Sequence, residues 1–521
     1  MTVKENGQPQ PLTREAESDV RVVAKGGGVQ LLGQMTNAVF SLLFNAVAVR
    51  FLGSAGFGLY RQTFQVMSIG GQAGVAGFNL GAVRFLTRAR AEGSAGAALS
   101  AARTTLLCAA ISSGAVFIGL WVFADPLAAA FGDGDASRAE LASLFRLGAA
   151  YVPLFAIQET ARFSTQANRT MVPSVVVGNI VQPVSRFIFG TAALMAGLAV
   201  AGAVGALVMS VAVGSVAALR YYRRLLTKRE RSAAPSAEVR PIVRFSLLQS
   251  GTTLLGVQRM GIGIILLGLL SSDNEVGLFA VALSLQGLVT ISLNGIGGIW
   301  APVVSDLYER NEMARLGSLY QTISRWVATF ALPVAALLIV DPDLFVQLLA
   351  GDKAARAIPL VAILAVGNLF YASTGPSGLL ISMTGRPGVN LLISVVTVTS
   401  YVVFGYLFVP RYGALAMAYI DASVTVVVNL IRVLLGWRLV GIQPFGRTYL
   451  KPVGATAAAV AVLLVWKFAL VSSVAVQLAG VLVAAAVYFL VLRVMGLDPE
   501  ERHVFDRIRA KLPWPPRRTR R

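Results

Sequence analysis

Charged residues are scarce in this chain of 521 residues: Asp, Glu, Lys and Arg together make up 13% of it, against 56% hydrophobic residues. The mean hydropathy is +0.70. A soluble protein cannot cover its surface with so few charges, so the chain is predicted to be an integral membrane protein. About fourteen apolar stretches follow one another, and each approaches the roughly 20 residues that a helix needs to span a bilayer. The sequence therefore predicts an all-α membrane protein with about 14 transmembrane helices.

Cysteine and histidine are almost absent, since Cys108 and His503 are the only residues of their kinds. A single cysteine permits neither an intrachain disulfide nor a cysteine-based metal site. The lone histidine lies in the C-terminal tail, so the predicted spans hold no histidine for acid–base chemistry. No loop is long enough for a catalytic domain, and no Walker-type phosphate loop occurs. These absences favour a transporter without a cofactor, and a membrane glycan polymerase or ligase is the alternative from another class.

Positive charge dominates, with 45 Lys and Arg against 25 Asp and Glu and a formal net charge of +20. On a soluble protein this excess would suggest nucleic acid. Here the cations cluster in alternate loops and in both tails, and roughly four-fifths lie on one side if both termini are cytoplasmic. The excess therefore predicts topology and contact with anionic lipid headgroups, and no nucleic-acid partner.

The chain contains two similar halves. "GFGLY" at 56–60 is echoed by "EVGLF" at 275–279, and "VGALVMSVAVGSV" at 204–216 by "YGALAMAYIDASV" at 412–424. Six predicted spans separate the copies, so both halves cross the membrane in the same sense, as parallel repeats do. The predicted layout is a cytoplasmic tail (1–21), an N-terminal six-helix lobe (22–226), a basic cytoplasmic linker (227–242), a C-terminal six-helix lobe (243–438), an appended two-helix hairpin (450–495) and a basic cytoplasmic tail (496–521).

Polar side chains form stripes along otherwise apolar helices. Two of these helices flank a short turn predicted at 53–58. In lipid such a stripe must face other protein or a watery cavity. We predict a cavity, with hydrogen bonding between packed helices as the alternative. The stripe residues include Gln30, Gln34, Asn37, Ser41 and Asn45 before the turn, Arg61, Gln65, Ser68, Gln72 and Asn79 after it, and Gln249, Thr253, Arg259, Gln286, Thr290 and Asn294 in the second half.

Arginines lie deep inside two predicted spans, Arg259 in the seventh and Arg186 in the fifth. A charge at that depth is costly if it faces lipid, so each should face the cavity or an acidic partner such as Glu159 or Asp421. A guanidinium stays ionised and can bind two oxygens of a phosphate at once. The predicted substrate-binding residues are Arg259, Arg186, Arg61, Arg84, Gln34, Asn37, Gln65, Gln72, Gln249, Gln286 and Asn294.

Arg61 and Arg84 lie nearer to span ends, where snorkelling and a role in topology are the alternatives. Glu159 and Asp421 are carboxylates well inside apolar segments. A carboxylate at that depth can carry a coupling proton or bind Na⁺. The alternative for each is a structural salt bridge.

The opening "GGGVQLLGQMTNAVFSLLFNAVAVRFLGSAGFGLYRQTFQV…GFNLGAVRFL" resembles the bacterial polysaccharide-transport flippases, the O-antigen and exopolysaccharide exporters. These belong to the multidrug/oligosaccharidyl-lipid/polysaccharide exporter superfamily. The resemblance covers essentially the whole chain. It implies two lobes arranged as a V that alternate access in the bacterial inner membrane, coupled to an ion gradient.

The substrate that the resemblance implies is a polyprenyl-diphosphate-linked oligosaccharide, moved from the cytoplasmic to the outer leaflet for cell-surface polysaccharide biosynthesis. A polysaccharide polymerase and glycosyltransferases are the implied protein partners. A peptidoglycan-precursor flippase and a multidrug or cation antiporter of the same superfamily are alternatives, as is an inactive scaffold descended from a flippase.

Overall fold

The computed structural model describes residues 14–131, 134–168, 170–234, 236, 239–384, 386–469 and 473–496. Within these ranges the side chains of 14–28, 31, 252–260, 296–299, 301–302 and 387 are not described. Every regular element in the described ranges is a helix, which confirms the predicted all-α class. Eleven of the described helical stretches are long and apolar enough to cross a membrane. The count of fourteen stays a prediction.

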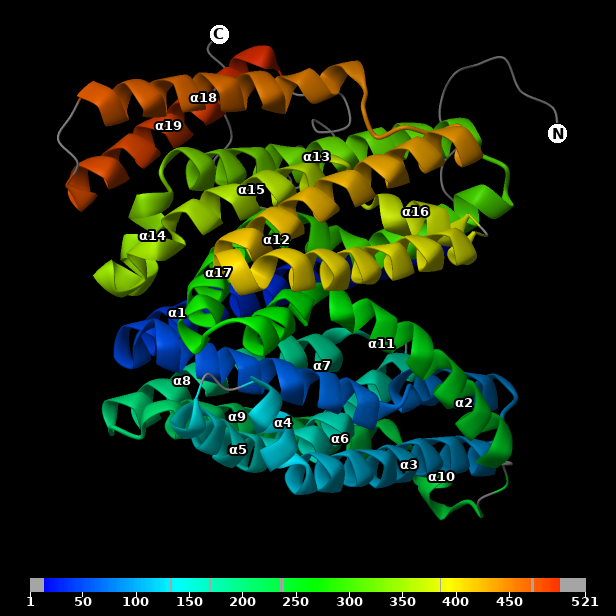
Figure 1. Cartoon of the computed structure of the whole chain (residues 1–521). Coiled ribbons are helices and arrows are strands. Elements are labelled where there is room, and N and C mark those ends of the chain that lie inside the picture. Colours follow the sequence, from blue (N-terminus) through cyan, green and yellow to red (C-terminus); the bar gives the residue numbers. More distant parts are fainter. Residues whose placement is uncertain are drawn as a thin grey trace, which may run out of the picture.

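The first helices form one group, the N-terminal group, in the lower half of Figure 1. Its elements are α1 (Arg14–Val75), α2 (Phe78–Ala91), α3 (Ala95–Val122), α4 (Ala124–Phe131), α5 (Asp135–Ala149), α6 (Tyr151–Ser164), η1 (Thr165–Asn168), α7 (Val172–Val175), the π-helix η2 (Val176–Val181), α8 (Gln182–Met195), α9 (Ala199–Leu225) and α10 (Lys228–Ser232).

The C-terminal group forms the upper half of the same view, and the hairpin α18–α19 lies along its far side (Figure 1). Its elements are α12 (Asp273–Glu309), α13 (Met313–Val340), α14 (Pro342–Ala350), η3 (Gly351–Ala357), α15 (Ile358–Ser373), α16 (Ser377–Met383), α17 (Pro387–Val440) and η4 (Arg447–Tyr449), followed by the hairpin helices α18 (Leu450–Ala469) and α19 (Val474–Met495).

The predicted turn at 53–58 is wrong in its extent. Helix α1 continues through these residues, and only Gly53 leaves helical geometry, with φ 71° and ψ −179°. Glycine adopts this positive φ without the steric cost that a Cβ brings. Helix α17 has the same device at Gly413, where φ is 55°. A single glycine therefore replaces a loop in each case, and two predicted spans merge into one kinked helix.

Helix α1 packs along α12, and this contact joins the two groups. A Cβ built at Gly58 would overlap the carbonyl oxygen of Asp273, and one built at Gly277 would overlap that of Ser54. Gly58 and Gly277 are 219 residues apart in the sequence, as are Ser54 and Asp273. The two halves thus contact each other through matching positions, as two copies of a repeat would around a two-fold axis.

Polar groups surround this glycine contact. Gln62 Nε2 donates a 2.8 Å hydrogen bond to Asp273 Oδ1, and Ser54 hydrogen-bonds Asn274. We call the contacts of Ser54, Gly58 and Gln62 with Asp273, Asn274 and Gly277 the seam. Beside it, Arg50 Nη2 donates to the carbonyl oxygen of Leu348 at 2.6 Å. The seam therefore closes this end between the groups by backbone approach and hydrogen bonding together.

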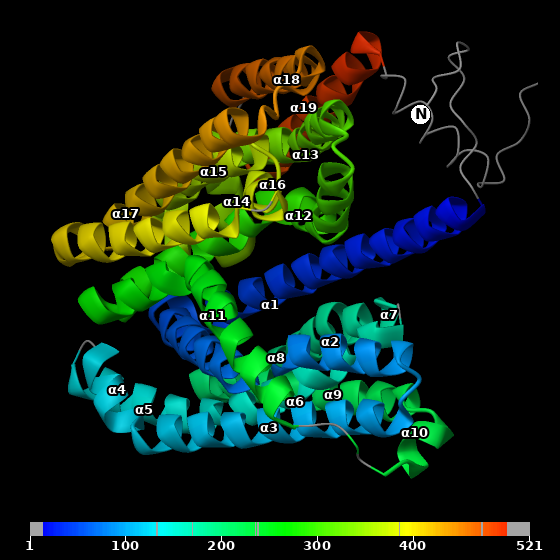
Figure 2. The same cartoon turned by 90° about the vertical axis from the view of Figure 1, so that its right-hand side faces the viewer.

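Helix α11 (Val239–Leu270) passes from one group to the other (Figure 2). Near its start, Phe245 packs edge-on against Phe85 of α2, with ring centroids 5.8 Å apart. Near its end, Gly263 lies against Phe279 of α12 and Met417 of α17. The start of α11 therefore belongs by its contacts to the N-terminal group, although the chain enters the C-terminal lobe of the predicted layout at 243.

Candidate functional site

Two arginines of the N-terminal group lie against one aromatic ring. The central guanidinium carbon of Arg61 lies 5.6 Å from the Phe64 ring centroid, and that of Arg186 lies 6.0 Å from it. Arg186 also lies 5.4 Å from the centroid of Phe44. Helical spacing explains this arrangement, because Arg61 and Phe64 are three residues apart on α1 and share a face. Arg186 reaches the same place from α8.

A short hydrogen-bonded chain connects Arg186 to the predicted stripe on the first half of α1. Arg186 Nη2 donates to Ser41 Oγ at 2.7 Å, and Ser41 Oγ in turn donates to Asn37 Oδ1 at 3.2 Å. The structure thus brings together three predicted substrate-binding residues, Arg61, Arg186 and Asn37. We call these three with Ser41, Phe44 and Phe64 the arginine cluster.

The arginine cluster carries positive charge without a carboxylate to balance it. Within the described part of the chain neither guanidinium forms an ion pair, and the Nε atoms of Arg61 and Arg186 are buried without a hydrogen-bond partner. The two groups also repel each other electrostatically. Both side chains are half-buried, and a cation withdrawn from water is normally paired, because an unpaired buried charge is costly. The cluster is therefore a concentration of positive charge, which the aromatic faces of Phe44 and Phe64 partly offset.

Other predicted polar residues lie elsewhere along the same helices. Gln65 is buried and packs against the backbone of α11, where a Cβ built at Gly261 would overlap its amide. Gln34, Gln72, Gln249 and Gln286 are half-buried, and Asn294 is exposed. In the described part of the chain no hydrogen bond or ion pair joins Gln286 or Asn294 to the arginine cluster, whereas Asn45 of the same α1 stripe donates to Ser284 Oγ of α12 at 3.0 Å.

Glu159 is in a structural ion pair. Its two carboxylate oxygens accept hydrogen bonds from Arg162 Nε at 2.6 Å and Nη2 at 2.8 Å. Arg162 Nη1 also donates to Ser174 Oγ at 3.0 Å, and its guanidinium lies against Gly178 of the π-helix η2. Glu159 thus has the salt-bridge partner that its predicted alternative requires, although that partner is Arg162 rather than Arg186 or Arg259, and its coupling role stays a prediction.

Asp421 lies in the C-terminal group, where its Oδ1 accepts a 2.7 Å hydrogen bond from the hydroxyl of Tyr401. Both residues belong to α17, on either side of the Gly413 kink. Nearby in sequence, Arg432 is buried and donates to Asn390 Oδ1 at 3.1 Å. The C-terminal group therefore has two polar pairs of its own on α17, and the coupling role predicted for Asp421 stays a prediction.

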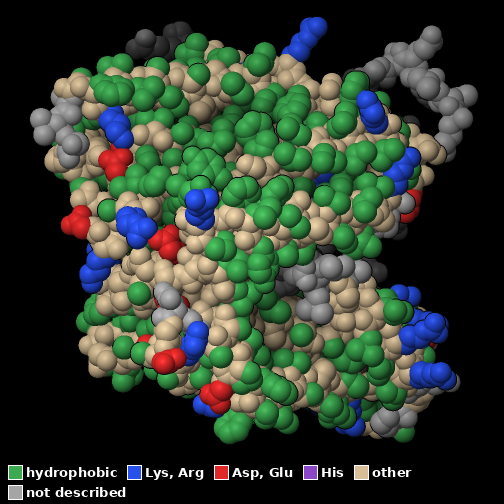
Figure 3. Space-filling model, viewed as in Figure 1, with side chains coloured by type: hydrophobic (Ala, Val, Ile, Leu, Met, Phe, Trp, Pro, Cys, Tyr) green, Lys and Arg blue, Asp and Glu red, His purple; other side chains and the backbone are tan. Residues whose placement is uncertain are grey.

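Arg84 lies apart from the arginine cluster, in the middle of α2. It is exposed, and its guanidinium carbon lies 4.4 Å from the ring centroid of Phe245 at the start of α11. Exposed basic residues are also found near the C-terminal ends of α2 and α9 and on α10, and Figure 3 shows blue side chains gathered at the right margin of the lower group. The side chain of Arg259 lies outside the described residues.

Sequence reasoning missed two parts of the site. One is the pair of aromatic rings, Phe44 and Phe64, against which the arginines lie. In the sequence these residues cannot be distinguished from other apolar residues of a membrane helix. Arg162 could have been found, because it follows Glu159 by three residues and helix geometry places such pairs side by side.

The chain matches the family model described as "Polysaccharide biosynthesis protein" over residues 23–308. An uncharacterised membrane protein of Methanocaldococcus jannaschii is 21% identical over 138 residues, which are 26% of this chain and 27% of that protein. The chain thus spans about a quarter of the length of this curated relative.

Solved transporter structures are similar over most of the chain. The lipid II flippase MurJ, in an inward closed conformation, matches with a TM-score of 0.71 and 10% identity over 89% of this chain and 98% of MurJ. A multidrug resistance MATE family transporter of the MOP superfamily, in an inward-facing conformation, matches with a TM-score of 0.67 and 16% identity. The match covers 80% of this chain and 98% of that transporter. A MOP superfamily transporter from Pyrococcus furiosus matches with a TM-score of 0.58 and 16% identity, over 81% of this chain and 96% of that transporter. At these identities the likeness establishes the fold alone.

Proposed function

Because the chain belongs to the polysaccharide biosynthesis protein family and has the fold of MOP superfamily transporters, we propose that it is a flippase for polyprenyl-diphosphate-linked oligosaccharide. The direction proposed is from the cytoplasmic to the outer leaflet of a bacterial inner membrane, with both termini cytoplasmic. The product would serve cell-surface polysaccharide biosynthesis, with a polymerase and glycosyltransferases as partners.

The observation that carries this proposal is the unpaired arginine cluster. A diphosphate is compact and doubly anionic, and a guanidinium can bind two of its oxygens at once. The guanidinium carbons of Arg61 and Arg186 lie 5.6 and 6.0 Å from the Phe64 ring centroid, so both positive charges act on the same region of the protein. Asn37 and Ser41 add an amide and a hydroxyl beside the cations, which suit the hydroxyl groups of a sugar.

The closed seam supports alternating access. The two groups of helices contact each other at the end that holds Gly58 and Gly277, whereas the surface in Figure 3 is hollowed between them at the right of the view. The exposed basic residues of α2, α9 and α10 lie toward that right-hand side. If basic loops are cytoplasmic, this conformation admits substrate from the cytoplasm.

A peptidoglycan-precursor flippase is the second candidate, because lipid II also carries a polyprenyl diphosphate and the MurJ fold covers 89% of this chain. The arginine cluster fits both substrates equally, since the diphosphate is common to them. A drug extruder is less well supported, because the unpaired cations of the arginine cluster repel cationic compounds. The coupling ion, H⁺ or Na⁺, remains part of the proposal, with Glu159 and Asp421 as the candidate carboxylates.

The test is transport in proteoliposomes. We expect the purified protein to move a fluorescent polyprenyl-diphosphate oligosaccharide between leaflets, and the double substitution Arg61→Gln with Arg186→Gln to abolish this movement. Arg88→Gln is the matched control, because Arg88 is an exposed arginine paired with Glu92. A polyprenyl-linked oligosaccharide without the diphosphate should not be moved. Equal transport by the double variant and the wild type would refute the proposed role of the arginine cluster.

A further inference from the structure

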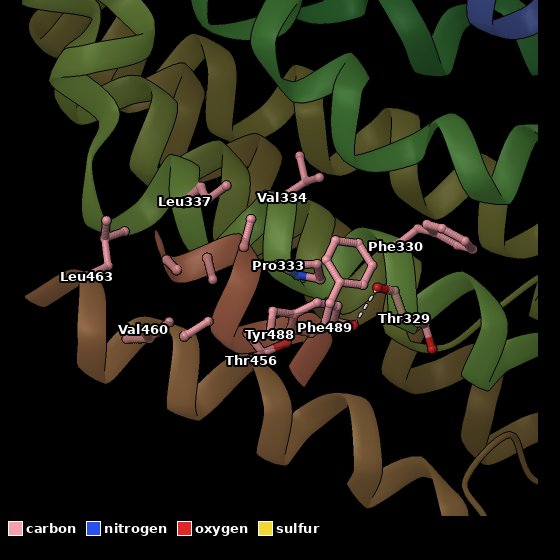
Figure 4. Close-up of a pocket in the computed structure, with 14 residues that line it drawn as sticks. Thr329, Phe330, Pro333, Val334, Leu337, Thr456, Val460, Leu463, Tyr488 and Phe489 are labelled. Carbon is pink, nitrogen blue, oxygen red and sulfur yellow. Dashed lines mark hydrogen bonds between the residues drawn. The ribbon is translucent and has the colours of Figure 1, made fainter. Parts of the chain in front are cut away.

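An apolar cleft of about 310 Å³ lies where the hairpin α18–α19 meets α13 (Figure 4). Small side chains on the hairpin, including Ala459, Ala484 and Ala485, leave the space open. Phe330 and Phe489 also line it, and both are about two-thirds exposed (65% and 66%). The cleft therefore opens to the surface of a helix pair that the bilayer surrounds.

One end of the cleft is closed by a hydrogen bond between the hairpin and α13. Pro333 has no N–H, so it cannot donate to the carbonyl oxygen of Thr329, four residues earlier in the helix. The hydroxyl of Tyr488 donates to that oxygen at 2.6 Å instead (Figure 4). The backbone group freed by the proline is thus satisfied, and the walls of the cleft offer hydrocarbon contacts.

Beyond the other end, a polar cluster carries net negative charge. It lies one helical turn past the lining residues Leu337 and Leu463. Lys467 Nζ donates to the carbonyl oxygen of Val340, to Asp341 and to Asp343 at 2.9 to 3.0 Å. These bonds use all three ammonium hydrogens, and two carboxylates against one ammonium leave one negative charge. Gln477 Nε2 donates to the other Asp343 oxygen, Oδ2, at 2.9 Å. The Asp343 side chain is nevertheless 38% exposed, and each carboxylate oxygen can accept more than one hydrogen bond, so it can accept a further donor.

An apolar cleft in a bilayer is filled by hydrocarbon. Water gains no hydrogen bonds on such walls, and an empty space forfeits dispersion contacts. The charge at the Asp343 end decides which lipid fits: it repels a phosphate that carries no counter-charge and attracts an ammonium. A polyprenyl diphosphate is therefore disfavoured at this end, and a phospholipid with an amine headgroup is favoured.

We propose that this cleft binds one acyl chain of an aminophospholipid such as phosphatidylethanolamine, with the lipid ammonium against Asp343. On the predicted topology this lipid belongs to the outer leaflet. It would fill the space between the hairpin and α13, so that a bilayer lipid is part of the packing of the C-terminal group. The inference does not depend on the proposed transport activity.

The test compares neighbouring alanines on α19. Ala485 lines the cleft, whereas Ala486 is exposed and does not line it. The protein is extracted from nanodiscs of equal phosphatidylethanolamine and phosphatidylglycerol, and the retained lipid is identified by native mass spectrometry. We expect the wild type and Ala486→Phe to retain one phosphatidylethanolamine, and Ala485→Phe to lose it. Asp343→Asn should abolish the preference for phosphatidylethanolamine over phosphatidylglycerol.

A measurement on the unmodified chain covers the case in which Ala485→Phe fails to fold. Phosphatidylethanolamine with a photoreactive group on its acyl chain should label peptides of α18 and α19 that contain Leu463 or Phe489. Retention of the lipid by folded Ala485→Phe, or labelling confined to other helices, would overturn the proposal. Recovery of a polyprenyl phosphate in place of phosphatidylethanolamine would also overturn it.

Discussion

Arg61 and Arg186 lie on one aromatic ring, with guanidinium carbons 5.6 and 6.0 Å from the Phe64 centroid and no carboxylate paired with either in the described chain. Their mutual repulsion costs stability until an anion binds. We therefore expect Arg186→Gln to leave the melting temperature of the ligand-free protein unchanged or higher. The same substitution should weaken binding of a polyprenyl diphosphate about 10- to 100-fold, which corresponds to ~1.5–3 kcal/mol for a charged hydrogen bond.

Thermal melting in detergent, with and without the diphosphate lipid, checks this expectation. Arg88→Gln, on the exposed surface, is the control. A lower melting temperature of ligand-free Arg186→Gln, with unchanged affinity, would identify Arg186 as a structural residue.

Adding a single methyl group at the seam should change the conformation of the protein. Gly58→Ala or Gly277→Ala would drive a methyl group into a backbone carbonyl of the opposite group, and backbone cannot move aside as a flexible side chain can. We expect either substitution to shift the protein toward a state open at this end. Spin labels on Asp135→Cys and Asp352→Cys, two exposed positions near the seam in a Cys108→Ser background, should report longer distances.

Gly114→Ala serves as the control for the seam variants, because a Cβ at Gly114 meets nothing within 4 Å. Unchanged label distances in both seam variants would mean that the contact is not the barrier between the groups.

The Glu159–Arg162 pair should matter for stability. Its side chains are only 8% and 19% exposed, and removal of one partner from a buried pair leaves an uncompensated charge. We expect Glu159→Gln to cost about 3 kcal/mol of unfolding free energy, measured by thermal or denaturant unfolding. The double variant Glu159→Gln with Arg162→Gln should recover part of this loss. A stable Glu159→Gln that loses ion-dependent transport would instead favour the coupling role.

Tyr488 and Pro333 should be coupled energetically. Tyr488→Phe leaves the Thr329 carbonyl oxygen without a donor, which costs about 1–3 kcal/mol for a buried group. In a Pro333→Ala background the helix regains its own N–H donor, so the same substitution should cost much less. A double-mutant cycle from melting curves gives the interaction energy. Additive effects of the two substitutions would contradict this account.

Acid should loosen the linker through Glu230. Burial opposes ionisation of Glu230, but the hydrogen bonds from Arg90 and Thr227 outweigh it and hold the pKa of this carboxyl below its ordinary value. The group therefore contributes stability that is present above its ordinary pKa and is lost as the pH falls through the lowered one. Hydrogen exchange of α10 should accelerate in that acidic range.

Glu230→Gln should show the loosened α10 already at neutral pH and should lose the acid dependence. An acid-induced loosening of the same size in Glu230→Gln would mean that another group titrates.

The fold class followed from composition, because 13% charge with recurrent apolar stretches leaves only a helical membrane protein. Continuity of the helices did not follow. Gly53, Ser54 and Gly56 read as a turn, yet only Gly53 departs from helical geometry. Turn-forming residues indicate where a chain can bend. How many of them leave helical geometry depends on packing, here of α1 against α12.

The sequence predicted those site residues whose free-energy cost can be judged from their own position in an apolar span. A charge inside an apolar span must find a partner, and this rule picked out Arg186, Glu159 and Asp421. The rule does not name the partner, which depends on how distant helices pack. Arg186 of α8, for example, reaches the Phe64 ring of α1, and no spacing within the sequence connects these two residues.

The reciprocal contact of Gly58 and Gly277 has a mechanical consequence. Each half of the protein contributes one glycine that lies against a backbone carbonyl of the other half. Gly58 contacts Asp273, and Gly277 contacts Ser54. The contacting residues lie four apart on each helix, so a movement that separates the two groups here must break both contacts. Separation of the two groups at the seam should therefore occur in a single step, and partly open states should be short-lived.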